Sequence, residues 1–267
     1  MLDFLKTCDK LFYTFGAEQV AVHNELDRVQ AKAIKEGTSF EESEAVRPST
    51  NEAKWIASTK AKNGVVSMSV IAKTLGYVAP AGFIVNNWKT LHSELAYFEK
   101  SDPKLSIVYR NKRYPCILDL ADKTTAFKYQ VVGLDFCLKN PEYGVSYAQK
   151  RFLLNIPNTQ FVQITADNFG KLSRVASCLS ADSVKLLIKD KCLYAQYGLE
   201  SSTANTASLL LGEINAEDSL IGKFKLDLIL GLRRAFGDDV PVYIRKNVLY
   251  AGFDNDNYSG VVSLIGS

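Results

Sequence analysis

Four segments of the chain carry hydrophobic side chains at helical spacing, and strand-like runs follow each of them. In the first segment the hydrophobic positions are Leu5, Cys8, Leu11, Phe12 and Phe15. Their spacing predicts an amphipathic helix, because residues three or four apart share one face of a helix. After Gly16 come two strand-like runs, at residues 19–23 and 28–34, which predict a β-hairpin.

The same order of elements recurs in the second half of the chain. Its helical positions are Phe169, Leu172, Val175, Ala176 and Leu179. Asp167 and Asn168 precede them and are typical of a helix start. Residues 184–188 and 192–197 then flank a short polar turn, which predicts a second hairpin. Two helix–hairpin units in the same order indicate an internal duplication.

A second type of unit, in which a short strand leads into a helix and a hairpin, also occurs twice. The predicted elements of the first copy are a strand at 83–85, a helix from Trp88 to Phe98, and strands at 105–109 and 114–118. Those of the second copy are a strand at 223–224, a helix that ends at Gly237, and strands at 240–244 and 248–253. Chance recurrence is the alternative, but the shared order of helices, strands and turns favours duplication.

The duplication predicts two domains. We expect a first domain at residues 1–135, a connector at 136–158 and a second domain at 159–267. Within the first domain, residues 36–63 are polar and rich in Glu, Ser, Thr and Lys. Such a stretch has little apolar surface to bury, so we expect an insertion that lies outside the core.

The composition is that of a folded protein. The chain has 267 residues, and 47% of them are hydrophobic, which excludes collagen-like, low-complexity and disordered chains. The net charge of +3 permits a polyanionic partner without requiring one. The sequence has no apolar run of about 18 residues and no signal-like start, so we expect neither a membrane span nor secretion, and a cytoplasmic location.

Residues that could support catalysis or bind a metal are sparse. The cysteines are Cys8, Cys116, Cys137, Cys178 and Cys192, and the histidines are His23 and His92. No two cysteines are close in sequence, so we expect no metal and no cofactor, and we interpret the cysteines as reduced core residues. Asp238, Asp239 and residues 254–256 lie beside glycines between strand-like runs, where Asp favours turns. We expect a protein that is not an enzyme, although an active site built from tyrosines and Asp-rich turns stays open.

The second half of the chain resembles one domain of a DNA sliding clamp. The residues that carry the resemblance are 161–169 (FVQITADNF), 183–190 (SVKLLIKD) and 224–226 (FKL). In that family a strand leads into a short helix, further strands follow, and a second helix precedes the last sheet. Residues 239–265 resemble that last sheet. The first domain is similar mainly through the duplication.

The resemblance implies an α+β fold of two clamp-like domains, with antiparallel sheets outside and two helices per domain on the inner face. Two domains per chain resemble the trimeric clamps of eukaryotes, archaea and some tailed phages, which close a ring around duplex DNA. A homotrimeric processivity factor that tethers a replicative DNA polymerase to double-stranded DNA is thus implied, in the host cytoplasm if the source is a virus. Whether a clamp loader is needed stays open. Herpesvirus polymerase accessory subunits share the fold, so a duplex-binding protein that forms no ring is the alternative.

Such a ring needs cations on its DNA-facing helices, because contacts to phosphates hold DNA of any sequence. The candidates are Lys6, Lys10, Lys89, Lys171, Arg174, Arg233 and Arg234. Lys6, Lys10, Lys171 and Arg174 lie away from the hydrophobic positions of their helices, as the charges of any solvated helix face also would. Lys89 follows Trp88, and Arg233 and Arg234 close the last helix. Asp3, Asp9, Glu94 and Asp227 share these helices and count against a uniformly basic surface.

Clamp-like proteins also bind a short polymerase peptide in an apolar pocket beside the connector. The candidate residues here are Leu134, Phe136, Tyr143, Leu264 and Ile265. The alternative is that Phe136 and Leu138 form the last strand of the first domain and face its core, which we favour for Leu138.

Overall fold

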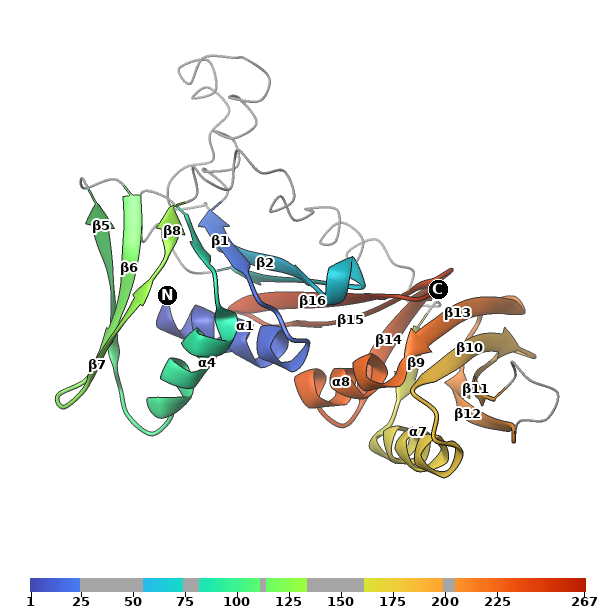
Figure 1. Ribbon diagram of the computed structural model, residues 1–267. Helices are drawn as coiled ribbons and strands as arrows, with labels where there is room; N and C mark the ends of the chain where they lie inside the picture. Colours follow the sequence, from blue (N-terminus) through green and yellow to red (C-terminus); the bar gives the residue numbers. More distant parts are fainter. Residues whose placement is uncertain (25–54, 74–81, 111–113, 134–160, 199–204) are drawn as a thin grey trace, which may run out of the picture. The chain divides into compact units, whose positions relative to one another are not determined.

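The computed structural model describes residues 1–24, 55–73, 82–110, 114–133, 161–198 and 205–267 (Figure 1). The chain forms two compact units. Unit 1 comprises Met1–Lys62, Met68–Ser146 and Asp254–Gly260. Unit 2 comprises Asn63–Ser67, Tyr147–Phe253 and Val261–Ser267. The predicted connector at 136–158 lies outside the described residues.

Unit 1 combines two helices with antiparallel strands. Its helices are α1 (Leu2–Thr14) and α4 (Trp88–Tyr97), and its strands are β1 (Val20–Asn24), β2 (Trp55–Ala61), β3 (Val66–Ala72), β4 (Phe83–Val85), β5 (Lys104–Arg110), β6 (Tyr114–Ala121), β7 (Ala126–Gln130) and β8 (Val132–Gly133). A short 3₁₀ helix, η1 (Lys62–Gly64), follows β2. The strand orders are β8-β4-β1-β2-β3 and β5-β6-β7.

Unit 2 repeats this combination. Its helices are α7 (Ala166–Leu179) and α8 (Leu226–Phe236), and its strands are β9 (Phe161–Ile164), β10 (Ser183–Lys189), β11 (Cys192–Tyr197), β12 (Ala207–Glu213), β13 (Ser219–Lys225), β14 (Val240–Arg245), β15 (Val248–Asp254) and β16 (Tyr258–Ile265). The strand orders are β12-β11-β10-β13 and β16-β15-β14-β9.

The duplication is visible in the strand order. In unit 1 the order β4-β1-β2-β3 places the fourth strand beside the first, and in unit 2 the order β13-β10-β11-β12 does the same. This is the strand order of a Greek key, in which a long connection returns the last strand to the first. In both units one helix precedes the first of these strands and another follows the fourth. The predicted α+β fold with two equivalent halves is therefore confirmed.

The helices form where the hydrophobic spacing predicts them. The side chains that α1 buries are Phe4, Leu5, Cys8, Leu11 and Phe12, and those that α7 buries are Phe169, Leu172 and Ala176. The start of α7 differs from the prediction, since the N-cap is Thr165, whose Oγ1 accepts a hydrogen bond from Asn168 N at 3.3 Å. Asp167 and Asn168 lie in the first turn, where a carboxylate is also favourable beside the helix dipole.

Three predicted hairpins are confirmed as antiparallel pairs, β5–β6, β10–β11 and β14–β15. The tight turn between β10 and β11 consists of Asp190 and Lys191, and both adopt left-handed backbone angles, with φ of 51° and 58°. Two such residues in succession match the right-handed twist of the flanking strands. The turn explains why a polar pair interrupts two alternating strands.

The predicted first hairpin and the predicted insertion are wrong in part. β1 pairs with β2 on one edge and with β4 on the other, so neither edge is open to residues 28–34, which lie outside the described residues. Residues 55–61 were expected outside the core as part of the insertion 36–63, yet they form β2, and Trp55 and Ala57 are fully buried. Residues 36–63 are polar on average, and this average did not indicate the buried strand at residues 55–61.

The interpretation of the cysteines as core residues holds for Cys8 alone among the described ones. Cys8 is buried, Cys116 and Cys192 are half-buried, and Cys178 is exposed on α7. All four are free thiols.

The Asp-rich segment before β16 forms a turn, as predicted. Asn255 Oδ1 accepts hydrogen bonds from the backbone N–H groups of Asn257 and Tyr258 at 3.0 and 2.8 Å. Lys73 fixes the same turn, because its Nζ lies 2.5 Å from Asp254 Oδ1 and 2.6 Å from the carbonyl oxygen of Asn255. The carboxylate of Asp254 thus serves to anchor the loop.

Candidate nucleic-acid interface

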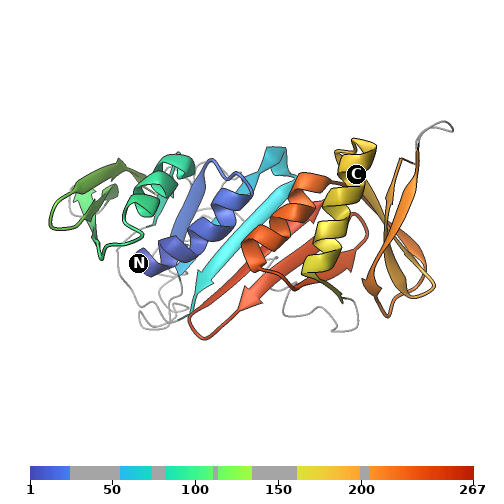
Figure 2. The ribbon, with the colours of Figure 1, turned by 90° about the horizontal axis from the view of Figure 1, so that it is seen from below.

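Each unit brings its two helices side by side, so the seven candidate cations fall into two groups (Figure 2). In unit 1, Lys6 and Lys10 lie on α1 and Lys89 lies on α4. Lys10 and Lys89 are exposed, and Lys6 is half-buried. Within the described chain, none of these three lysines forms an ion pair with an Asp or Glu. Their charge is therefore available to an external anion.

Asp9 holds the two helices of unit 1 together. Its Oδ1 accepts a hydrogen bond from Trp88 Nε1 at 2.9 Å, and its Oδ2 lies 2.7 Å from His92 Nδ1. The ring of Tyr13 stacks on the His92 ring at a centroid distance of 3.5 Å, so two successive turns of α1, at Asp9 and at Tyr13, contact α4. The carboxylate that counted against a basic surface is thus directed into the helix contact, and its side chain is only 16% exposed.

In unit 2 the cations of α7 are partly neutralised by an acid on the same helix. Lys171 Nζ lies 2.5 Å from Asp167 Oδ2, and Arg174 Nη2 lies 3.9 Å from Asp167 Oδ1. The hydrogen bond from Lys171 is the main reason that the pKa of Asp167 lies below its ordinary value. Because all three side chains are exposed, these pairs contribute little to stability.

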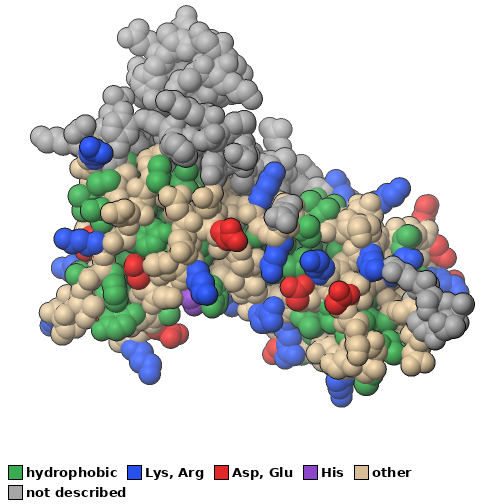
Figure 3. All heavy atoms as spheres, viewed as in Figure 1, with side chains coloured by type: hydrophobic (Ala, Val, Ile, Leu, Met, Phe, Trp, Pro, Cys, Tyr) green, Lys and Arg blue, Asp and Glu red, His purple; other side chains and the backbone are tan. Residues whose placement is uncertain are grey.

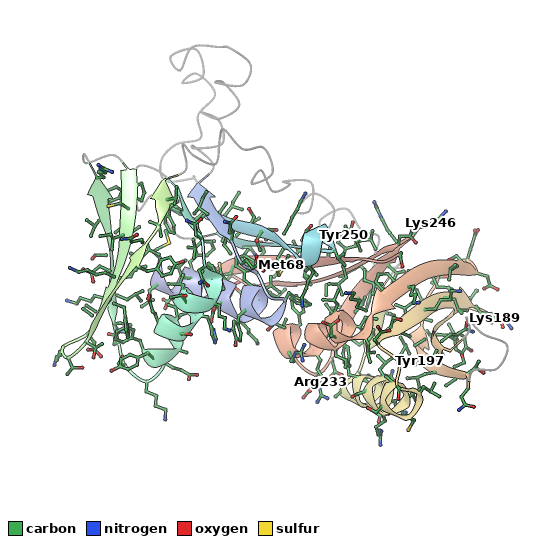
Figure 4. The ribbon with its side chains drawn as sticks, in the orientation of Figure 1. Met68, Lys189, Tyr197, Arg233, Lys246 and Tyr250 are labelled. Carbon is green, nitrogen blue, oxygen red and sulfur yellow. The ribbon has the colours of Figure 1, made fainter. Side chains whose placement is uncertain are left out.

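The two arginines of α8 lie at the end of the helix. Arg233 Nε and Nη2 both donate to Asp238 Oδ1, at 3.1 and 2.8 Å (Figure 4). Arg234 Nη2 donates to the backbone oxygen of Asp227 at 3.4 Å. Cations are favourable at a helix C-terminus because the helix dipole is negative there. Arg233 donates two hydrogen bonds to a carboxylate, whereas Arg234 donates one longer hydrogen bond to a backbone oxygen, so Arg233 is held more strongly.

The space-filling view shows basic side chains interspersed with acidic ones on the visible face (Figure 3). Sequence reasoning located the cations but missed their partners on other turns and loops, namely Asp167 and Asp238. It also missed His92, because nothing in the local pattern indicates that a residue on one helix faces Asp9 on another.

Of the candidate polymerase-binding residues, the structure describes Leu264 and Ile265, at the end of the chain. Leu134, Phe136 and Tyr143 lie outside the described residues. Leu264 is fully buried, whereas Ile265 is 45% exposed and its N–H donates to the carbonyl oxygen of Val65 at 2.8 Å. Of the two described candidates, Ile265 is the one whose side chain is accessible to a ligand.

Two further observations concern the described residues alone. They contain no group of three or more His, Cys, Asp or Glu side chains placed to hold a metal ion. None of their helices is long and apolar enough to cross a bilayer.

Comparison with solved structures defines the class of fold. The β sliding clamp of C. crescentus matches with a TM-score of 0.62 and 16% identity, over 98% of this chain and 63% of that chain. The sliding clamp DnaN of Bartonella birtlesii, a DNA polymerase III subunit β, matches with a TM-score of 0.62 and 12% identity over the same shares. The chain thus spans less than two thirds of these bacterial clamps.

A third structure matches nearly from end to end. The proliferating cellular nuclear antigen of Entamoeba histolytica matches with a TM-score of 0.57 and 14% identity, over 98% of this chain and 96% of that chain. No protein-family model matches the sequence, and no curated protein matches it. The agreement therefore lies in the fold, and the chain has the sliding-clamp fold.

Proposed function

We propose that this protein is a DNA sliding clamp, a processivity factor that tethers a replicative DNA polymerase to double-stranded DNA. The observation that carries the proposal is the duplicated Greek-key unit with two helices in each half, in a fold that matches solved sliding clamps. Such a protein needs no active site of its own. We propose that it acts in the cytoplasm, or in the host cytoplasm if the source is a virus.

The cations of the helices support a DNA-binding role. Lys10 and Lys89 are exposed on neighbouring helices of unit 1, and Lys171 and Arg174 share one carboxylate in unit 2. Cations on mobile side chains suit phosphate contacts that carry no sequence information. Each contact is weak and sensitive to salt, which allows a protein to slide along the duplex.

A homotrimer is the proposed assembly. The match over 96% of the Entamoeba antigen indicates a chain of the same two-domain length. β12 lies at the edge of its sheet and β5 at the edge of another. Open edge strands pair readily with another chain, and pairing between copies would cover them.

Retention on DNA tests the proposal. The protein is added to nicked circular duplex and to the same plasmid after linearisation, and its retention is measured after gel filtration at about 0.15 M salt. Its native mass is measured in parallel. A ring predicts a trimer that stays on circles and leaves linear DNA through the ends. A monomer retained equally on both forms would contradict the ring and favour the duplex-binding alternative.

A charge-reversal series tests the helix surface. Lys10→Glu and Lys89→Glu are expected to weaken duplex binding, and each should reduce the salt dependence of the binding constant by about one counterion. The matched control is Lys189→Glu, at an exposed position at the end of β10 (Figure 4). Equal losses in all three variants would show a general effect of net charge rather than a helix surface.

A further inference from the structure

A continuous row of apolar side chains crosses the exposed face of the four-stranded sheet in unit 2. The register pairs Leu220 with Leu187, Leu187 with Tyr194, and Tyr194 with Leu210, so one residue comes from each of the strands β13, β10, β11 and β12. Leu220 is 55% exposed and Leu210 is 48% exposed. Leu187 and Tyr194 are half-buried between them. With strands about 4.8 Å apart, the row is about 14 Å long.

The row is not part of the hydrophobic core. The alternate residues of the same strands supply the core on the opposite face, for example Val184, Leu186 and Leu193, which are at most 1% exposed. An antiparallel sheet with one covered face normally alternates apolar and polar residues, with the polar ones toward water. Four large apolar side chains in line on the water-facing side depart from this alternation and indicate a binding surface.

The equivalent sheet of unit 1 differs in this respect. β3 is buried at every position, and β2 is buried at every position except one. In β10 and β11, by contrast, buried positions alternate strictly with outward positions that are half-buried or exposed. Among the described residues, the sheet of unit 2 thus presents a partly exposed apolar row, whereas β2 and β3 of unit 1 present none.

Lysines flank the row on one side. On the neighbouring rung Lys185 lies directly opposite Lys223, and on the next rung Ser183 lies opposite Lys225. Lys185 on β10 and Lys225 on β13 make this flank of the row basic. On the other side of the row the outward charges have both signs. There Cys192 lies between Lys189 on β10 and Glu213 on β12.

We infer that this face binds an acidic segment of a partner protein. Large apolar side chains of that segment cover the row formed by Leu220, Leu187, Tyr194 and Leu210. Its carboxylates lie along one flank and meet Lys185 and Lys225. The charge on that flank selects an acidic protein segment over a basic one. The inference does not depend on DNA binding.

Selection of peptides tests the inference. A displayed library of random 12-residue peptides is selected on the immobilised full chain. We expect the enriched peptides to combine at least two large apolar residues with Asp or Glu. Their affinity, measured by fluorescence anisotropy with the synthetic peptides, should fall at least tenfold for Leu220→Ser and for Lys185→Glu. Replacing the acidic residues of the peptide by lysine should restore binding to Lys185→Glu.

The control variant is Val108→Ser, which removes an apolar side chain of similar exposure from β5 in unit 1. It should bind the selected peptides as the original chain does. Enriched peptides without acidic residues, or peptides that bind Leu220→Ser unchanged, would overturn the inference. A native mass that falls for Leu220→Ser alone would also overturn it, because the row would then contact a second copy of this chain. Circular dichroism of each variant verifies that it is folded.

Discussion

Asp9 Oδ1 accepts the indole N–H of Trp88 across the contact between α1 and α4, at 2.9 Å. Trp88 is fully buried, so its N–H has no access to water if this acceptor is removed. Asp9→Ala should therefore lower the free energy of unfolding by about 2–3 kcal/mol, since a buried donor loses its partner. Chemical denaturation followed by fluorescence measures the change.

Two further variants separate the hydrogen bond from the charge. Trp88→Phe removes the donor and some packing. Glu99→Ala removes one negative charge at an exposed position just beyond α4, and so controls for the charge that Asp9→Ala removes. Combining Asp9→Ala with Trp88→Phe should cost less than the sum of the single changes, because both remove the same bond. Strict additivity would show that the bond contributes nothing to stability.

Neutralising Asp167 should strengthen DNA binding. Asp167→Asn releases Lys171 and Arg174 from their shared carboxylate. We expect tighter binding to duplex DNA and a salt dependence steeper by about one counterion. Glu217→Gln makes the same change in net charge at an exposed position between β12 and β13. An equal gain from Glu217→Gln would mean that net charge, rather than the α7 cations, controls binding.

Tyr197 should make stability depend on pH in the alkaline range. Its side chain is 1% exposed, and its Oη donates to the carbonyl oxygen of Leu172 at 3.1 Å. Burial raises the pKa of Tyr197 from 10.0 to about 12. The folded state therefore keeps the proton at a pH where the unfolded state has lost it. The resulting stabilisation is complete below pH 10 and is lost as the pH rises from 10 to about 12.

Tyr197→Phe provides the comparison. At pH 8 the variant should be less stable by about 1 kcal/mol, because the hydrogen bond is lost. Above pH 10 the original chain should lose stability faster than the variant, by up to about 1.4 kcal/mol per pH unit. Urea denaturation from pH 8 to 11 measures both. Parallel pH profiles would show that Tyr197 does not titrate differently in the two states.

Gly198 should tolerate no side chain at the end of β11. Its φ is +72°, and a Cβ atom there would lie 2.1 Å from the carbonyl oxygen of Asn205. Gly64 has a similar φ of +83° but open space around it. Gly64→Ala should cost about 1 kcal/mol from backbone strain alone. Gly198→Ala should cost at least about 2 kcal/mol in thermal or chemical unfolding, and equal costs would show that the steric contact relaxes freely.

The local pattern of the sequence determined the helices and the tight hairpins. Helical spacing places Leu5 and Phe12 on one face whatever the rest of the chain does, and a two-residue turn such as Asp190–Lys191 sets the pairing of its own strands. The recurrence of these local units was enough to predict the duplication. These features depend on neighbours within a few residues, so the sequence specifies them directly.

Only the tertiary structure decided which distant segments meet. β1 pairs with β2 on one edge and with β4 on the other, and both of these strands come from far along the chain. The partners of the cations, and the contact of Asp9 with His92, depend on helix packing. The apolar row exists only because the register of four strands aligns one residue from each. Pairing across long separations depends on the total packing of the domain, which no local pattern encodes.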